Sequence, residues 1–273
     1  MPFLQLASRK IHYTDLQPPK AHQDPPVHDP DETLVFTHGL GSSQNFYHAV
    51  AVGLQAQGIR CILFDTSGAG RSPYTQVAGQ GEQSVESLAS DVLGVLDALG
   101  VQRAGVVGHS MGGIVASQLA AQYPSRILAA ILIGPVYPSP SVIPVFESRI
   151  QAIEKNGMEA VANSVPQTAT GARASPLTRS FIRELILAQD PAGYISHCRV
   201  IINAQPPDYA AIRVPVLVLA GEEDRSAPLE ACRRMFEELG TSGDRKRLEV
   251  LEGVGHWHCL EDGGGGVRDV DGR

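Results

Sequence analysis

The sequence predicts an α/β domain in which a mostly parallel sheet is covered by helices on both faces and interrupted by an all-helical insertion. Short apolar runs alternate with helical patterns from residue 34 to 133, and the same rhythm resumes from 214 to 251. Such alternation implies right-handed crossovers between parallel strands. Residues 139–204 instead carry helical patterns and no convincing strand. The chain of 273 residues, 43% of them hydrophobic, is long enough for one such domain with an insertion.

The predicted elements follow from the spacing of apolar residues. Two alternating stretches in residues 3–14 predict an antiparallel strand pair at a sheet edge, and a proline-rich loop follows over 17–31. Further strands are predicted at 34–36, 59–64, 104–107, 129–133, 214–219 and 248–251. Helices are predicted after Ser42 or Ser43, over 84–99, from Met111 onward and over 228–239.

The insertion contains four predicted helices. They are the segment of Val142 to Ile153, the short segment 158–165, the segment opened by Ser175-Pro176 and the segment opened by Asp190-Pro191. A cap residue followed by proline is typical of a helix start. Because open α/β sheets bind ligands beyond the carboxyl ends of their strands, we interpret residues 137–205 as a lid on a core formed by 1–136 and 206–262. Additional scaffold helices are the alternative interpretation. We expect the glycine-rich tail, 263–273, to be disordered.

Composition excludes several classes of function. The net charge is 22 − 29 = −7, which argues against a nucleic acid or an anionic membrane surface as partner. No apolar run approaches the roughly 18 residues of a membrane span, and the first residues do not resemble a signal peptide, so we expect a cytoplasmic protein. The four cysteines are scattered and form no Cys-x-x-Cys pair, so we expect free thiols and no metal site.

The strand at 104–107 leads directly into the sequence Gly108-His109-Ser110-Met111-Gly112, after which a helical pattern begins. This is the nucleophile-elbow pattern in its strand–turn–helix context. A sharp turn exposes the hydroxyl of Ser110, and glycines flank it because side chains at those positions would collide with neighbouring backbone. A glycine-rich turn with an incidental serine is the alternative interpretation.

A serine hydroxyl needs a general base, and the base needs an acid that orients it. His256 follows the last predicted strand in a tight Gly255-His256 turn, and Asp224 follows the strand at 214–219. These residues complete the order Ser, Asp, His, which is that of the α/β hydrolases. The alternatives are His258 for the base, and Glu222 or Glu223 for the acid.

An acyl-transfer site also needs two donors for the oxyanion. The backbone N–H of Met111 is one candidate, and the N–H of Leu40 in the turn His38-Gly39-Leu40-Gly41 is the other.

Taken together, the motifs resemble those of the α/β-hydrolase superfamily. They are His38-Gly39-Leu40-Gly41, Asp65-x-x-Gly68-x-Gly70-Arg71-Ser72, Gly108-His109-Ser110-Met111-Gly112-Gly113, the turn Gly221–Asp224 and Gly255-His256-Trp257. The chain resembles the 3-oxoadipate enol-lactonase-like serine hydrolases, and similarly the small regulatory and strigolactone-receptor-like members with four-helix lids. One departure is that four glycines follow Glu261-Asp262, where the family usually has a final helix.

The resemblance implies an α/β-hydrolase fold and a serine hydrolase that acts on a small ester or lactone without a cofactor. A ligand sensor that hydrolyses slowly or once, and recruits a protein partner through the lid, is the alternative. We expect Phe146 and Phe181 of the lid, with Trp257, to line the substrate pocket. If the substrate carries a carboxylate, the candidate cations are Arg71, Arg173 and Arg199.

Overall fold

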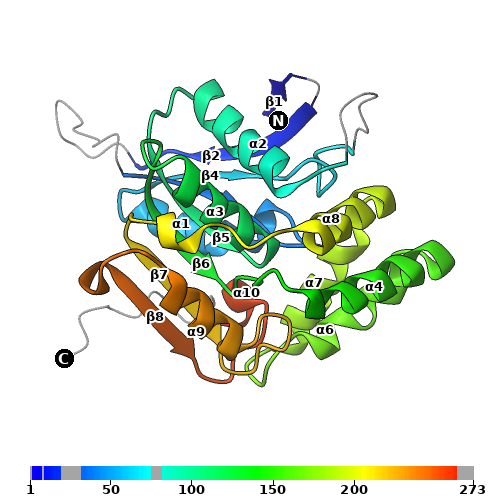
Figure 1. The fold of residues 1–273 in the computed structure, drawn as a ribbon. Helices are drawn as coiled ribbons and strands as arrows, with labels where there is room; N and C mark the ends of the chain where they lie inside the picture. The colour runs from blue at the N-terminus through cyan, green and yellow to red at the C-terminus, as the bar shows by residue number, and fades with distance from the viewer. Residues whose placement is uncertain (1, 8, 20–31, 75–81, 263–273) are drawn as a thin grey trace.

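The computed structural model describes residues 2–7, 9–19, 32–74 and 82–262, which build a single eight-stranded sheet in the order β1-β2-β4-β3-β5-β6-β7-β8 (Figure 1). The strands are β1 (Phe3–Leu6), β2 (Arg9–Leu16), β3 (Thr33–Thr37), β4 (Arg60–Phe64), β5 (Ala104–His109), β6 (Ile127–Ile133), β7 (Val216–Gly221) and β8 (Lys246–Leu251). Strand β2 pairs antiparallel with β1 and β4, and every other pairing is parallel. The predicted fold class and the antiparallel edge are confirmed.

The helices between these strands also follow the sequence pattern. They are α1 (His48–Ala56), α2 (Val85–Ala98), α3 (Met111–Gln122) and α9 (Leu229–Glu238), whereas the short α10 (His258–Glu261) follows β8 and was not among the predicted helices. Helix α2 begins at a capping box, in which the Ser84 side chain accepts from the Ser87 N–H and the Ser87 side chain accepts from the Ser84 N–H. The expected disordered tail lies outside the described residues.

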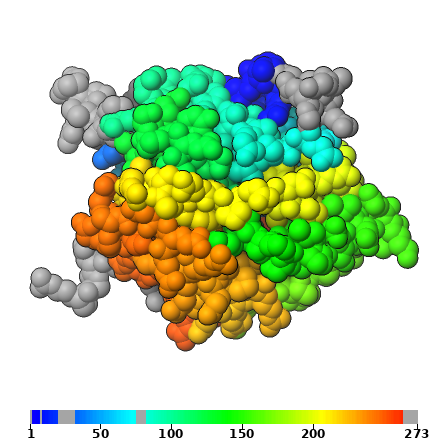
Figure 2. Space-filling view, in the orientation of Figure 1, coloured from blue at the N-terminus to red at the C-terminus, as the bar shows by residue number. Residues whose placement is uncertain are grey.

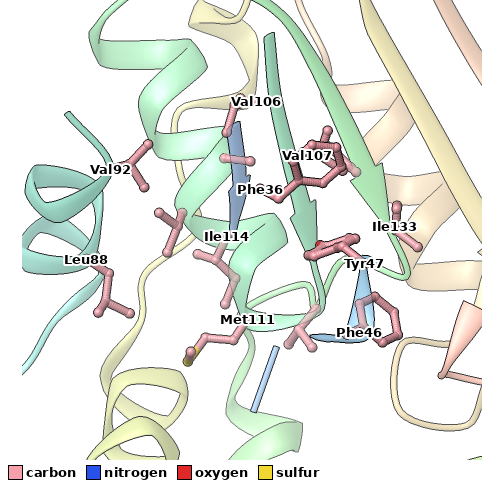
Figure 3. Close-up of a cluster of buried hydrophobic side chains, with 14 of the residues drawn as sticks. Phe36, Phe46, Tyr47, Leu88, Val92, Val106, Val107, Met111, Ile114 and Ile133 are labelled. Carbon is pink, nitrogen blue, oxygen red and sulfur yellow. The ribbon is translucent and has the colours of Figure 1, made fainter. Parts of the chain in front are cut away.

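The core lies between α2, α3 and the central strands β3 and β5 (Figure 3). Leu88 and Val92 of α2 are almost fully buried beside α3, which contributes Met111 and Ile114. Burial of each such side chain stabilises the fold by roughly 1.5–3 kcal/mol relative to exposure. The start of α3, next to Ser110, is therefore anchored in the hydrophobic core.

Residues 137–205, hereafter the helical insertion, form five α-helices and not the predicted four. They are α4 (Ile143–Asn156), α5 (Glu159–Ala162), α6 (Val165–Thr168), α7 (Pro176–Leu187) and α8 (Pro191–Asn203). The predicted helix over 158–165 is the incorrect one, because Pro166 lacks an N–H and its ring clashes with the preceding turn, so the chain breaks into α5 and α6. Figure 1 shows α4, α6, α7 and α8 gathered to one side of the sheet.

Contacts at α8 and before α7 are among those that attach the helical insertion to the rest of the protein. Along α8, the His197 ring donates to the Ser67 carbonyl at 2.9 Å, and Gly193 lies directly against Gly68. Before α7, the backbone of residues 169–173 lies on the loop between β8 and α10. In the space-filling view the insertion, green to yellow, lies directly against the orange C-terminal segments (Figure 2). Within the described residues, no helix is both long and apolar enough to span a bilayer.

Candidate active site

Ser110 lies in a strained turn between β5 and α3. Its φ of 57° and ψ of −116° are unusual for a residue with a side chain, and such a conformation costs of order 1–3 kcal/mol. The Ser110 N–H donates to the Ile133 carbonyl at 3.0 Å, which fixes the turn to β6. A Cβ on Gly108 would approach the Gly112 carbonyl oxygen to 2.2 Å, and a Cβ on Gly112 would approach that of Thr37 to 2.2 Å. The two glycines are therefore required for close backbone packing, as the sequence predicted.

Three side chains from distant parts of the chain form one hydrogen-bond chain. The Ser110 Oγ lies 2.9 Å from the His256 Nε2, and the His256 Nδ1 lies 2.8 Å from the Asp224 Oδ2. All three residues are buried, with exposed fractions of 5%, 8% and 4% for Ser110, His256 and Asp224. The imidazole therefore donates to the carboxylate and can accept the serine proton.

Asp224 is held in place by backbone donors as well as by His256. Its Oδ1 accepts from the N–H groups of Ser226 and Ala227, each at 2.8 Å. Burial alone would raise the pKa of Asp224, but the charge and hydrogen bond of His256 outweigh burial, so the pKa of this carboxyl lies below its ordinary value. The alternative acids are exposed and accept elsewhere, Glu222 from the Gly253 N–H and Glu223 from the Ala172 N–H.

Two further histidines position the His256 backbone. His109 Nε2 and His258 Nδ1 both donate to the carbonyl oxygen of His256, at 2.8 and 2.9 Å. Burial lowers the pKa of His258 to about 4 and holds that of His109 well below its ordinary value, so both rings are neutral at pH 7. Neither ring contacts Ser110 through a hydrogen bond within the described residues. His258 thus supports the His256 backbone and does not hydrogen-bond to the serine. No signal in the sequence separates the roles of these two histidines.

A buried carboxylate clamps the loop that carries His256. Glu261 Oε2 accepts from the N–H groups of Gly171 and Gly255 at 2.7 and 2.9 Å, and its Oε1 accepts from the Trp257 N–H at 2.8 Å. The His256 N–H itself donates to the Ala169 carbonyl at 2.8 Å. The helical insertion and the His256 loop are therefore tied together on both sides of the imidazole. Sequence reasoning missed this role, because the partners of Glu261 lie as far away as Gly171.

A small cavity of about 30 Å³ opens beside Ser110, and we call it the Ser110 pocket. It is lined by Leu40, Ser110, Val136, Phe146, Arg149, Val165, Ala169, Ile186, Tyr194, Ser226, His256 and Trp257. Phe146 and Trp257, which the sequence places at a substrate pocket, line this cavity. Phe181 does not: it is 39% exposed and lines a separate surface pocket with His12 and Asp65. Its position on α7 faces the loops after β3 and β4, which carry Gln44 and Asp65, and periodicity alone does not give a helix its rotation.

The turn that carries Leu40 lies against Ser110. A Cβ on Gly39 would approach the Ser110 Cβ to 2.8 Å, which shows how closely the two turns pack. Among the described residues, neither the Leu40 N–H nor the Met111 N–H donates to a protein acceptor. Both donors therefore remain available near the serine hydroxyl.

The arginines proposed for a substrate carboxylate do not line the Ser110 pocket. Arg173 is ion-paired with Asp262, Arg199 with Glu82, and Arg71 lines the surface pocket that contains Phe181. The arginine that does line the Ser110 pocket is Arg149. In the part of the chain that the structure describes, no group of three or more His, Cys, Asp or Glu side chains is placed to hold a metal ion.

Comparisons with known proteins agree with this fold. RutD from Caulobacter sp. (strain K31), whose name provisionally assigns it carbamate hydrolysis, is 27% identical over 232 residues, which cover 82% of this chain and 84% of RutD. The 3-oxoadipate enol-lactonase 1 of Acinetobacter baylyi is 27% identical over 198 residues, 70% of this chain and 71% of that protein. The crystal structure of the enol-lactonase from Burkholderia xenovorans LB400 superposes with a TM-score of 0.82 at 27% identity and covers 96% of this chain and 95% of that one. The profile of the alpha/beta hydrolase fold family matches residues 32–263, and the chain belongs to this family.

Proposed function

We propose that this hydrolase cleaves a small carboxylic ester or lactone through an acyl-enzyme formed on Ser110. The observation that carries the proposal is the hydrogen-bond chain from Ser110 through His256 to Asp224, held at a strained turn of the family's type. The two similar enol-lactonases support the lactone part of the proposal.

The proposed reaction has two halves. The Ser110 Oγ attacks the substrate carbonyl carbon while His256 Nε2 accepts the hydroxyl proton, and His256 then returns that proton to the leaving alkoxide oxygen. In the second half, a water molecule gives a proton to His256 as its oxygen attacks the acyl carbon. The bond between the acyl carbon and the Ser110 Oγ then breaks, His256 returns that proton to the Oγ, and the acid is released. Asp224 keeps the imidazole in the tautomer that can accept this proton and stabilises the imidazolium.

The N–H groups of Leu40 and Met111 are the proposed oxyanion hole. Their position beside Ser110 and their lack of a partner among the described residues support this role. Loss of one such donor typically costs roughly 2.7–4 kcal/mol of transition-state stabilisation. We propose in addition that the helical insertion is a lid, because it contributes Phe146 and Tyr194 to the Ser110 pocket and thereby excludes water.

The test is a hydrolysis screen of short p-nitrophenyl esters, lactones and carbamates with the parent protein and Ser110→Ala. We expect the parent to turn over at least one ester or lactone and the variant to lose on the order of 10⁶ in kcat. Activity of Ser110→Ala within about tenfold of the parent would refute the assignment of the nucleophile. Sustained multiple turnovers would support an enzymatic role. A single covalent event per protein molecule would instead support the alternative role as a ligand sensor.

A further inference from the structure

We propose that two copies of this chain associate through strand β8, which pairs in antiparallel orientation with the β8 of the second copy about a twofold axis at Leu248. The contact lies outside the Ser110 pocket, and its partner is the chain itself. The inference therefore goes beyond the proposed function and does not depend on it.

Strand β8 leaves one edge of the sheet open. It is the last strand in the sheet order and pairs only with β7 (Figure 1). At its end, the Leu251 carbonyl accepts from the N–H of Glu222, directly after β7, at 3.0 Å. Because the direction of the backbone groups alternates along a strand, Lys246, Leu248 and Val250 present their N–H and C=O groups to the open edge. In the described chain no segment pairs with these groups, so they are a template for another strand.

The side chains of β8 alternate between the two faces of the sheet. On the face that α9 covers, the Lys246 Nζ donates to two carbonyls at the end of α9. On the opposite face, Arg247 and Glu249 form an ion pair with each other, and their side chains are 68% and 37% exposed. One positive and one negative charge therefore lie beside the open edge, within reach of a strand that pairs with it.

These charges select one register of pairing. In a continuous sheet with twofold symmetry the axis passes through a residue, because only then do paired side chains share a face. An axis at Arg247 would place two arginines opposite each other, and an axis at Glu249 would place two glutamates opposite each other. Like charges in such positions are destabilising. An axis at Leu248 instead places Arg247 of each copy opposite Glu249 of the other.

This register satisfies the open edge. The residues that face the edge would exchange about six backbone hydrogen bonds between the copies. Arg247 and Glu249 would lie opposite each other in the pairs between them, with Cα atoms about 4.5 Å apart. Together with the ion pair inside each copy, the four side chains form a closed ring of alternating charge. The aliphatic stem of Lys246 would cover the Val250 side chain of the other copy, which is 40% exposed in the single chain.

Self-complementarity favours a second copy over a different protein. An antiparallel partner has to present an acid opposite Arg247 and a base opposite Glu249, and β8 read in the reverse direction supplies both at this spacing. The same charges oppose strands that arrive in another register, which is how edge strands commonly avoid unspecific pairing.

The experiment is sedimentation velocity of the full chain at about 1 µM and at about 500 µM, a range that detects weak and moderately tight dimers. We expect the dimer fraction of the parent to rise with concentration. Glu249→Arg places arginine opposite arginine on both sides of the axis, and its dimer dissociation constant should rise about 10-fold or more. Arg247→Glu/Glu249→Arg restores opposite charges across the axis, and its constant should return to within about threefold of the parent value.

Matched variants separate this contact from changes in net charge or in folding. Glu82→Arg makes the same change in charge at an exposed side chain that is ion-paired with Arg199, away from β8, and should leave the dissociation constant unchanged. Val250→Pro removes one N–H from the open edge, a position where proline is tolerated, and should weaken the dimer, whereas Val250→Thr keeps the N–H and should not. Thermal melts show whether each variant is folded.

Three results would overturn the inference. They are a parent that stays monomeric at the higher concentration, a dimer that folded Glu249→Arg leaves as tight as the parent, and a double variant no tighter than Glu249→Arg. If Val250→Pro does not fold, the two charge variants decide the question alone. None of these measurements requires turnover, so the result stands whether or not the protein hydrolyses any of the esters or lactones.

Discussion

Replacement of Glu261 tests whether the loop that carries His256 is held by this one buried carboxylate. The side chain is 8% exposed and accepts three backbone N–H groups, from Gly171, Gly255 and Trp257. Two of these donors flank His256, and the third belongs to the helical insertion. The change therefore affects both the stability of the fold and the position of the imidazole.

The magnitude follows from the number of donors left unpaired. Each buried N–H without an acceptor costs about 1–3 kcal/mol, and breaking a buried charged network typically costs about 3–5 kcal/mol in total, so we expect the latter loss for Glu261→Ala. In Glu261→Gln the amide oxygen can replace Oε2 and keep two bonds, whereas the amide nitrogen then faces the Trp257 N–H. One bond is lost in this variant, and we expect a cost of about 1–3 kcal/mol.

The assay is urea unfolding of the parent, Glu261→Ala, Glu261→Gln and the control Glu222→Gln. Glu222 lies at the same end of the sheet but is exposed and accepts one N–H, from Gly253 at 2.9 Å, so its replacement should change the free energy of unfolding by less than about 0.5 kcal/mol. We also expect kcat to fall with little change in KM, since a misplacement of about 1 Å can cost on the order of 10²-fold. If Glu261→Gln were as stable and active as Glu222→Gln, the clamp would have no energetic role.

Three further predictions concern the acid, the buried histidines and the pocket wall. Asp224→Asn should lower kcat by about 10⁴-fold, and activity within about tenfold of the parent would contradict its role. Burial lowers the pKa of His197 and His258 to about 4 each, below the value of about 6.5 in an unfolded chain. Between about pH 6.5 and about pH 4 the unfolded state therefore binds more protons than the folded state. As the pH falls through this range, the free energy of unfolding should fall by up to about 3 kcal/mol per histidine. A free energy of unfolding that stays constant over this range in urea melts would contradict buried, neutral rings. Phe146→Ala should change the ratios of kcat/KM among acetyl, butyryl and octanoyl esters by an amount equivalent to roughly 1–3 kcal/mol. Phe181→Ala should leave these ratios unchanged, because Phe181 lies outside the Ser110 pocket. Equal changes in both variants would refute the assignment of the pocket wall.

The sequence by itself determined the fold class and the part of the site that depends on local geometry. The spacing of apolar residues over short stretches predicts the strands and helices. The turn at Ser110 requires glycine at positions 108 and 112, and both glycines are present in the sequence. Asp224 and His256 were predictable because each follows a strand, and the carboxyl ends of parallel strands meet at one edge of the sheet. Glu222, Glu223 and His258 remained alternatives until the structure showed which atoms meet.

Only the tertiary structure decided which side chains surround that hydrogen-bond chain. The rotation of α4 and α7 about their axes places Phe146 and Arg149 at the Ser110 pocket and Phe181 away from it, and this rotation depends on packing against other elements. Glu261 has its role because Gly171 lies next to Gly255, a contact between segments that are far apart in the sequence. Local sequence patterns determine the helices and strands and their order, whereas the charge and shape of the pocket arise from contacts between segments that are far apart in the sequence.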